Sequence, residues 1–363
     1  MRQDRIARVL SELQQMGLSQ LLITDPRSID YLTGVSVAPF ERFFALFLSV
    51  SGRHTLFLNA LFHVPEDVPI AKIRYTDTDD VTPLLASVID PALPLGVDKD
   101  IKARFLLPMM DQKIASGFVN ASFAVDITRG VKDDAERSLM RIASQINDQA
   151  MARFMGLVRE GITEKQVADQ MLAIYQELGA DDYSFSPIVS FGANAADPHH
   201  EPDDTPLQEG DCVLFDVGCR KDGYCSDMTR TFYFRHADPH AREIYDIVRR
   251  ANEAAEALIR PGVPLSVLDA AARDLITAAG YGPAFTHRLG HFIGLDEHEF
   301  GDVSASSAWV ARPGMIFSIE PGIYLTGDTG VRVEDLVLVT EDGCEVLNHF
   351  PKSLQIISGG DNT

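Results

Sequence analysis

Residues 211–227, DCVLFDVGCRKDGYCSD, decide how the second half of the chain folds. An apolar run carries one carboxylate, Asp216, and the pair Asp222-Gly223 follows it before a second carboxylate, Asp227. Asp-Gly between two strand-like runs is a strong signal for a two-residue hairpin turn. Side chains along a strand alternate between the two faces of the sheet. In a hairpin whose loop has an even number of residues, two residues on opposite strands therefore lie on the same face when the sum of their residue numbers is odd, as it is for 216 and 227. The sequence therefore predicts both carboxylates on one face of a sheet.

Two carboxylates on one face repel each other unless a proton or a cation lies between them. A lone acid in a strand is more often an edge or turn residue, so the metal interpretation needs further ligands. Residues 287–299, HRLGHFIGLDEHE, supply three histidines among glycines that permit tight turns. Neutral imidazole is a metal ligand. A further pair, His199-His200, follows Asp197-Pro198, where a solvated turn is the ordinary alternative.

Two later apolar runs each hold one carboxylate: residues 315–324, MIFSIEPGIY, contain Glu320, and residues 331–339, VRVEDLVLV, contain Glu334. A buried acid needs a partner. The ordinary alternative to a metal is a salt bridge between Glu334 and Arg332. Four carboxylates and one imidazole nevertheless suit two hard divalent ions better than a zinc finger or a copper site.

The composition excludes several classes of protein. The net charge of −21, from 53 acidic and 32 basic residues, argues against nucleic-acid binding and against docking on anionic membranes. No apolar stretch approaches the roughly 18 residues of a membrane span. The four cysteines form no CxxC pair, which is typical of free thiols in a reducing compartment. We therefore expect a cytoplasmic location and no membrane or nucleic-acid partner.

The pattern of elements predicts an α+β chain of two domains, as its 363 residues also suggest. Residues 1–20 have the spacing of an amphipathic helix, and strands alternate with helices to about residue 125, which indicates a smaller α/β domain. Residues 129–134 are short and polar and are interpreted as a linker. We place the domains at 1–128 and 129–363, with further helices expected over 135–158, 163–178, 238–259 and 265–279 in the second.

The ordered motifs resemble those of the pita-bread peptidases, a superfamily that includes prolidase, aminopeptidase P and methionine aminopeptidase. Two aspartates eleven residues apart precede a histidine in Gly-His-x-Ile-Gly, then Glu-Pro-Gly and Val-Arg-Val-Glu-Asp. The first part of the chain, including LLITDPRSIDYLTG at 21–34, is similar to the N-terminal domain of prolidases and aminopeptidases P. The resemblance implies a creatinase/prolidase-like N-terminal domain before a pita-bread catalytic domain.

The resemblance also implies roles for individual residues. It assigns two divalent ions to one ligand set. Because that set is rich in oxygen, manganese is the first choice of ion, and cobalt, zinc and iron are the alternatives. Asp216 would bind one ion, His291 and Glu320 the other, and Asp227 and Glu334 would bridge them. The catalytic residues that it implies are His199, His298 and Glu320, and the substrate-binding residues are His287 and Arg332.

The implied activity is hydrolysis of the Xaa-Pro bond in small proline-containing peptides, by a chain that is expected to form a homodimer. Dipeptides are the first choice of substrate, and the alternatives are an aminopeptidase P that acts on longer peptides and a binding protein that has lost catalysis. Two residues depart from the family pattern. Phe292 stands where glycine is common and Glu297 where isoleucine or valine is usual, and both are expected to reshape the substrate pocket.

Overall fold

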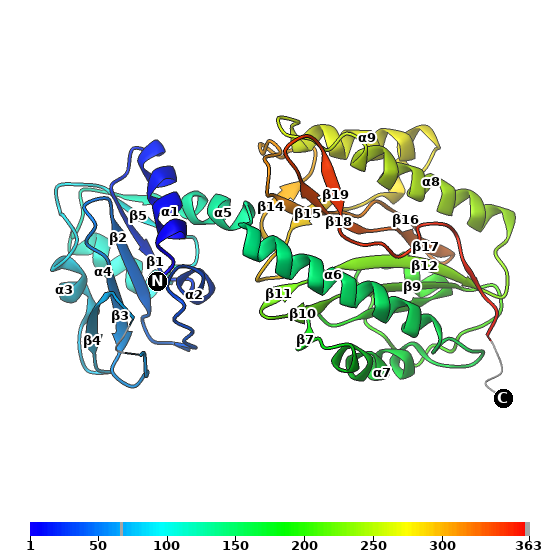
Figure 1. The fold of residues 1–363 in the computed structure, drawn as a ribbon, viewed down its shortest axis with the longest axis horizontal. Helices are drawn as coiled ribbons and strands as arrows, with labels where there is room; N and C mark the ends of the chain where they lie inside the picture. Colours follow the sequence, from blue (N-terminus) through cyan, green and yellow to red (C-terminus); the bar gives the residue numbers. More distant parts are fainter. Residues whose placement is uncertain (66–67, 360–363) are drawn as a thin grey trace. The chain divides into compact units, whose positions relative to one another are not determined.

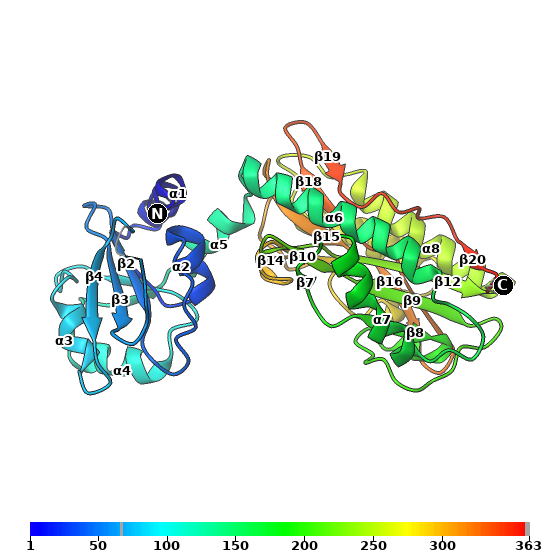
Figure 2. The same ribbon diagram turned by 60° about the horizontal axis from the view of Figure 1, so that its bottom comes forward.

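The computed structural model describes residues 1–65 and 68–359. It contains two compact units, Met1–Arg129 and Gly130–Thr363 (Figure 1). Figure 2 shows the same two units after a rotation. No helix in the described part of the chain combines the length and the apolar character that crossing a membrane requires.

The first unit is a six-stranded mixed sheet with helices around it. The strand order is β4-β3-β2-β1-β5-β6, in which β2 is antiparallel to β1 and β3, whereas β5 is parallel to β1 and β6. Its core is built from buried side chains of the sheet and the helices, such as Leu22, Phe47, Phe57 and Met109. The elements are α1 Gln3–Gln15, β1 Gln20–Ile23, α2 Pro26–Thr33, β2 Ala45–Ser49, β3 Thr55–Asn59, β4 Ala71–Tyr75, α3 Val81–Ala86, β5 Leu95–Val97, α4 Ala103–Asp111, β6 Phe118–Asn120 and α5 Ser122–Gly130.

Half of the segment interpreted as a linker, residues 129–134, belongs to two helices. Helix α5 continues to Gly130, and α6 begins at Asp134. Asp133 caps α6, because its side chain accepts a hydrogen bond from the Glu136 amide while the Glu136 side chain accepts one from the Asp133 amide. The connection between the helices is therefore shorter than predicted, residues 131–133, because the flanking polar residues belong to a helix end and a helix start.

The second unit combines two helix pairs with several antiparallel sheets. Helices α6 and α7 pack on strands β7, β8, β10 and β11, whereas α8 and α9 pack on β14 to β17 (Figure 1). The elements are α6 Asp134–Met155, α7 Glu164–Glu177, β7 Asp182–Tyr183, β8 Ile188–Phe191, η1 Gly192–Ala196, β9 Cys212–Val217, β10 Cys219–Lys221, β11 Tyr224–Cys225, β12 Met228–Phe234, α8 Pro239–Glu256, α9 Leu265–Ala278, η2 Gly282–Ala284, β13 Gly290–Phe292, β14 Glu299–Val303, β15 Ile316–Ile319, β16 Gly322–Leu325, β17 Thr329–Arg332, β18 Asp335–Val339, β19 Cys344–Val346 and β20 Ile356–Ile357.

The hairpin of residues 211–227 has the predicted register. Asp222 and Gly223 both have positive φ angles, 48° and 87°, as the two central residues of a type I′ turn require. Strands β9 and β12 pair so that Asp216 lies opposite Thr229. Asp227 precedes Thr229 by two residues and therefore lies on the same side as Asp216. Gly218 separates β9 from β10, and a side chain there would overlap Ser184 Oγ and the Ser226 carbonyl.

The second acidic pair comes from two other antiparallel strands. Ile319 of β15 pairs with Asp335 of β18, and the same register continued by one residue sets Glu320 opposite Glu334. The Glu334 amide donates a hydrogen bond of 3.1 Å to the Thr229 carbonyl. Because Thr229 is the partner of Asp216, this contact joins the two acid-bearing pairs of strands.

Candidate metal centre

A cavity of about 240 Å³ in the second unit gathers all nine site residues expected from the sequence. They come from strands β9, β13 and β17, from the residues that flank β12, β15 and β18, and from loops on both sides of β13 and after η1. The nine are His199, Asp216, Asp227, His287, His291, His298, Glu320, Arg332 and Glu334. Residues more than 130 positions apart in the sequence thus share one small site.

The innermost group consists of Asp227, His291 and Glu334, all of which are buried. One side-chain donor atom from each of them lies within 4.8 Å of the other two. His291 Nε2 also lies 3.6 Å from Asp227 Oδ2 and 3.4 Å from Glu320 Oε1. The imidazole therefore faces carboxylates contributed by both pairs of strands.

Hydrogen bonding directs one nitrogen of His291 into this group. Its Nδ1 lies 3.2 Å from the Phe292 carbonyl, which can only accept, so Nδ1 carries the proton. The lone pair of the neutral ring then belongs to Nε2, the atom that faces the acids. Burial, reinforced by the neighbouring His298, holds the pKa of His291 well below its usual range and keeps the ring neutral.

The carboxylates crowd one another in a poorly solvated space. Burial first, and then the charges of Glu334 and Asp216, raise the pKa of Asp227 well above its ordinary value. Burial and the charges of Glu320 and Asp216 do the same for the pKa of Glu334. For Glu320, burial raises the pKa to about 7 although Arg332 opposes the shift. Such a cluster binds protons or cations to offset its own repulsion.

The residues fit divalent cations. Asp216 Oδ1 and Asp227 Oδ1 are buried and have no hydrogen-bond partner among the described residues, although buried carboxylate oxygens are normally paired. Carboxylate oxygens with one neutral imidazole nitrogen form a donor set for hard or borderline divalent ions. Asp216, Asp227, His291, Glu320 and Glu334 supply that set, and cations would satisfy the unpaired oxygens.

Arg332 pairs with Asp216 and not with Glu334. Its Nη2 donates to Asp216 Oδ2 at 2.7 Å, and its Nε donates to Thr229 Oγ1 at 3.0 Å. Thr229 Oγ1 in turn donates to Glu334 Oε2 at 2.7 Å. The ordinary alternative considered above, a salt bridge between Glu334 and Arg332, is therefore wrong, because the guanidinium extends towards the other acidic pair.

The two residues expected to bind substrate already have protein partners. Arg332 is 2% exposed, and its Nη1 donates to the Tyr324 hydroxyl at 2.8 Å. The same hydroxyl lies 2.8 Å from His287 Nε2, while His287 Nδ1 lies 2.7 Å from the Arg288 carbonyl. Burial, followed by the charge of Arg332, lowers the pKa of His287 to about 4. A neutral His287 and a fixed Arg332 thus form one wall of the cavity.

Sequence reasoning missed four residues that line the cavity: Phe185, Ile188, Pro198 and Arg288. Arg288 forms no ion pair with a carboxylate among the described residues, and its closest polar side chain is His298, whose Nδ1 lies 3.4 Å from Nη2. The position of Arg288, directly after His287, was the one available signal. Glu297 was singled out as a departure from the family pattern, and it does line the cavity.

Phe292, the other departure, points away from the site. It follows His291 in strand β13, so its side chain lies on the opposite face. There it is fully buried and packs against Trp309 and Phe317, with ring centroids 5.1 and 5.7 Å apart. The expectation that Phe292 reshapes the substrate pocket was therefore wrong, because this ring fills the core behind the strand.

A second group of possible ligands, Glu164, His200 and Asp203, anchors a loop instead. Glu164 Oε1 accepts from the Phe191 amide at 2.7 Å and from Asn194 at 3.0 Å. Its Oε2 lies 2.7 Å from His200 Nε2 and accepts from the Asp203 amide at 3.1 Å. Since both oxygens are satisfied, this carboxylate holds the segment that carries His199 in place.

Comparisons with known proteins agree with this architecture. Residues 5–131 match the model of the creatinase/prolidase N-terminal domain, and residues 138–341 match that of metallopeptidase family M24. An uncharacterized peptidase of Staphylococcus aureus is 37% identical over 358 residues, which cover 96% of this chain and 99% of that protein. The crystal structure of dipeptidase PepE from Mycobacterium ulcerans has a TM-score of 0.92 at 35% identity, over 98% of this chain and 97% of that one. The structure of an Xaa-Pro dipeptidase from Bacillus anthracis has a TM-score of 0.88 at 29% identity, over 98% of this chain and 99% of that one.

Fold and site together define a metal-dependent peptidase with a creatinase/prolidase-type N-terminal domain and a pita-bread catalytic domain. The chain belongs to metallopeptidase family M24. The expected α+β fold class and the expected resemblance are both confirmed.

Proposed function

We propose that this chain is a prolidase, which hydrolyses the Xaa-Pro bond of dipeptides with two divalent metal ions per chain. The observation that carries the proposal is the cavity of about 240 Å³ lined by the proposed metal ligands and by Arg288. It is smaller than ordinary ligand pockets of roughly 300–1,000 Å³ and suits a substrate of two residues. The dipeptidase and Xaa-Pro dipeptidase named above share this fold along nearly their whole length, which supports the same substrate class.

The proposed metal ligands are Asp216, Asp227, His291, Glu320 and Glu334. Manganese is the first choice of ion, because four of the five ligands are carboxylates. Divalent cations in such a site supply Lewis-acid chemistry, which polarises a carbonyl and makes water a better nucleophile at neutral pH. Two unpaired buried oxygens, on Asp216 and Asp227, support two ions more strongly than a single ion held by Asp227, His291 and Glu334.

The substrate ends are recognised by different parts of the cavity. Arg288 has a guanidinium without a carboxylate partner in the described structure and is proposed to bind the free carboxylate of the proline residue. Phe185, Ile188 and Pro198 form an apolar wall that suits a pyrrolidine ring. A dipeptide offers both groups together, whereas a longer peptide would place an amide where its carboxylate should be.

Glu320, His199 and His298 are the groups proposed to move protons and to stabilise developing charge. Glu320 is proposed to accept the proton of the attacking water and to pass it to the departing proline nitrogen. The exposed ring of His199 has no hydrogen-bond partner among the described residues and lines the same cavity. His298 stacks on His291 with ring centroids 3.9 Å apart, and we propose that it stabilises the developing oxyanion.

One comparison of substrates tests the proposal. The purified chain with Mn²⁺ should cleave Ala-Pro much faster than Ala-Pro-Ala, and Arg288→Ala should raise KM for the dipeptide more than it lowers kcat. Cleavage of the tripeptide alone would make the chain an aminopeptidase P. Loss of turnover of both, with metal still bound, would favour a binding protein. The family resemblance also supports a homodimer, which light scattering would test. The four cysteines without a CxxC pair favour the cytoplasm, which cell fractionation would test.

A further inference from the structure

Buried asparagine side chains contact the main chain beside every proposed carboxylate ligand. Asn147 of α6 donates from Nδ2 to the Val217 carbonyl at 2.9 Å, directly after Asp216. Asn348, which follows β19, donates to the carbonyl of Asp227 itself at 3.1 Å and accepts from the Leu336 amide at 2.7 Å. Asn147 is 0% exposed and Asn348 is 3% exposed.

Asn252 of α8 contacts the other two ligand-bearing segments at once. Its Nδ2 donates to the Ile319 carbonyl at 2.8 Å and to the Val333 carbonyl at 3.3 Å. Ile319 directly precedes Glu320, and Val333 directly precedes Glu334. One fully buried amide thus joins the two strand ends that carry the second acidic pair.

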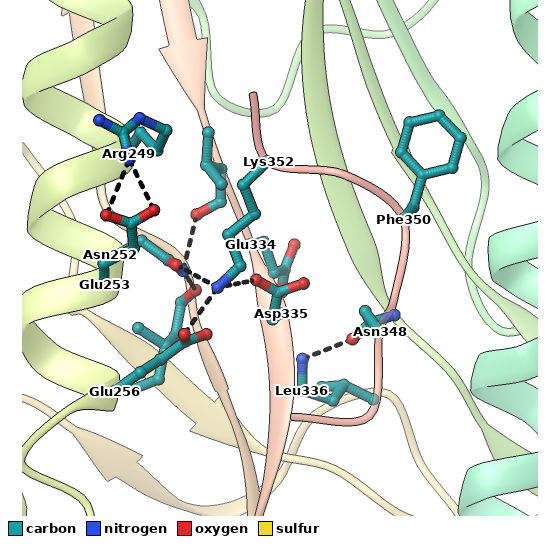
Figure 3. Close-up of polar contacts among 12 residues, drawn as sticks. Arg249, Asn252, Glu253, Glu256, Glu334, Asp335, Leu336, Asn348, Phe350 and Lys352 are labelled. Atoms are coloured by element: carbon teal, nitrogen blue, oxygen red, sulfur yellow. Dashed lines mark hydrogen bonds and ion pairs between the residues drawn. The ribbon is translucent and has the colours of Figure 1, made fainter. Parts of the chain in front are cut away.

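Lys352 fixes the orientation of that amide. Its ammonium lies 2.7 Å from Asn252 Oδ1, 2.6 Å from Glu256 Oε2 and 2.7 Å from Asp335 Oδ2 (Figure 3). The ammonium donates hydrogen bonds to Asn252 Oδ1 and Glu256 Oε2 and forms an ion pair with Asp335. Because Oδ1 accepts from Lys352, the NH₂ group of Asn252 must face the two carbonyls, as Figure 3 shows beside strand β18.

Arg230 completes the support behind Glu334. It is fully buried, donates to Asp335 Oδ1 at 2.6 Å and also donates to the Glu334 carbonyl. Two cations, Arg230 and Lys352, therefore face two carboxylates, Asp335 and Glu256. This balance of charge lets a polar network persist in the interior.

We infer that Asn252, oriented by Lys352, is a positioning residue that fixes the spacing between Glu320 and Glu334 for metal binding. In the same way, Asn147 fixes the main chain beside Asp216, and Asn348 fixes the main chain of Asp227. The inference rests on the metal site proposed above. Its physical reason is that Asp227, Glu320 and Glu334 lie directly beyond strand ends and Asp216 is the last residue but one of β9, so the hydrogen-bond ladder of the strands stops beside each of these carboxylates. The asparagine amides replace those missing bonds. Groups that orient metal ligands in this way influence metal affinity strongly.

The test compares Asn252→Ala with a matched control, Asn59→Ala, in the full-length chain. Asn59 is also a buried amide, 1% exposed, which donates to Asp77 Oδ1 at 2.7 Å and accepts from the Leu61 amide, but it lies in the other unit. Both substitutions remove comparable hydrogen bonds, so both should lower the melting temperature. Only Asn252→Ala should weaken Mn²⁺ binding, by about 10- to 100-fold in a calorimetric titration of metal-free protein.

A milder pair of variants decides the matter if Asn252→Ala does not fold. Lys352→Met leaves the amide in place but removes its orienting cation, and it should also raise the Kd for Mn²⁺, whereas Lys352→Arg should restore much of the affinity. Wild-type Kd in Asn252→Ala or, where that variant is unfolded, in Lys352→Met would overturn the inference. An equal loss of affinity in Asn59→Ala would also overturn it. A wild-type chain that binds no Mn²⁺ would instead overturn the metal site itself.

Discussion

The guanidinium of Arg332 lies 2.7 Å from the carboxylate of Asp216, and the two residues are 116 positions apart in the sequence. The contact compensates the charge of one proposed metal ligand from within the protein. It uses Asp216 Oδ2 and leaves Oδ1 buried without a hydrogen-bond partner in the described structure. Asp216 is thereby held by an arginine on one oxygen, while the other oxygen remains available for a cation.

Removing this arginine should destabilise the metal-free protein most. In Arg332→Met the partly buried Asp216 loses its counter-charge, which typically costs about 3–5 kcal/mol of unfolding free energy for a buried pair. Added Mn²⁺ should recover part of the loss, because a cation also compensates Asp216. Urea denaturation with EDTA and with Mn²⁺ measures both effects. An equal loss of unfolding free energy with EDTA and with Mn²⁺ would show that the arginine stabilises the fold independently of metal binding.

Neutralising Asp227, a proposed metal ligand, should have opposite effects on stability and function. Asp227→Asn preserves shape but removes one charge from a cluster in which burial and neighbouring acids already raise the pKa of Asp227. At pH 8 the metal-free variant should therefore melt at a higher temperature than metal-free wild type. It should also lose bound metal and turnover together. A variant that retains two ions per chain with normal turnover would remove Asp227 from the ligand set.

Metal binding should release protons below neutral pH. Burial raises the pKa of Glu320 to about 7, and burial with neighbouring charges raises those of Asp227 and Glu334 well above their ordinary values. At pH 6 the cluster therefore carries protons that a cation must displace, because cations bind the ionised carboxylates. Affinity for Mn²⁺ should rise between pH 6 and pH 8. Calorimetry at pH 6 in two buffers of different ionisation enthalpy gives the number of protons released when Mn²⁺ binds. Release of no protons would contradict the raised pKa values of these carboxylates.

Glu297 should favour substrates with a cationic first residue. Its half-buried carboxylate lines the cavity and has no hydrogen-bond or ion-pair partner among the described residues. A partly exposed charge pair contributes at most about 1 kcal/mol, so the preference for Lys-Pro over Leu-Pro should fall about two- to fivefold in Glu297→Gln. Ratios of kcat/KM for the two dipeptides give the answer. An unchanged ratio would mean that Glu297 does not face the first side chain.

Local signals in the sequence predicted much of this structure. The Asp222-Gly223 turn fixes the β10–β11 hairpin, and the same register continues into β9 and β12, so the shared face of Asp216 and Asp227 followed from parity alone. Thr163 caps α7 with a capping box, as its position before a helical pattern suggests. These features depend on residues close together in the chain.

Long-range pairing was beyond such reasoning. Arg332 stands two residues before Glu334, which favoured a local salt bridge, but the strands carry its guanidinium to Asp216. Asn252 and Lys352 are ordinary helix and loop residues in the sequence, and their contact with each other depends on how the last segment packs on α8. Phe292 was misjudged because a family pattern says which residue is unusual but not which face of a strand it occupies.

The central claim is tested most directly by a titration of metal-free protein with Mn²⁺. The heat of binding and the rate of Ala-Pro hydrolysis are measured at each metal concentration. The structure predicts that turnover appears with added metal and reaches its plateau at two ions per chain, and that Asp227→Asn shows neither the binding nor the turnover. Full turnover without metal, or binding of two ions with no hydrolysis of Ala-Pro, would contradict the assignment of this cavity as a dinuclear prolidase site.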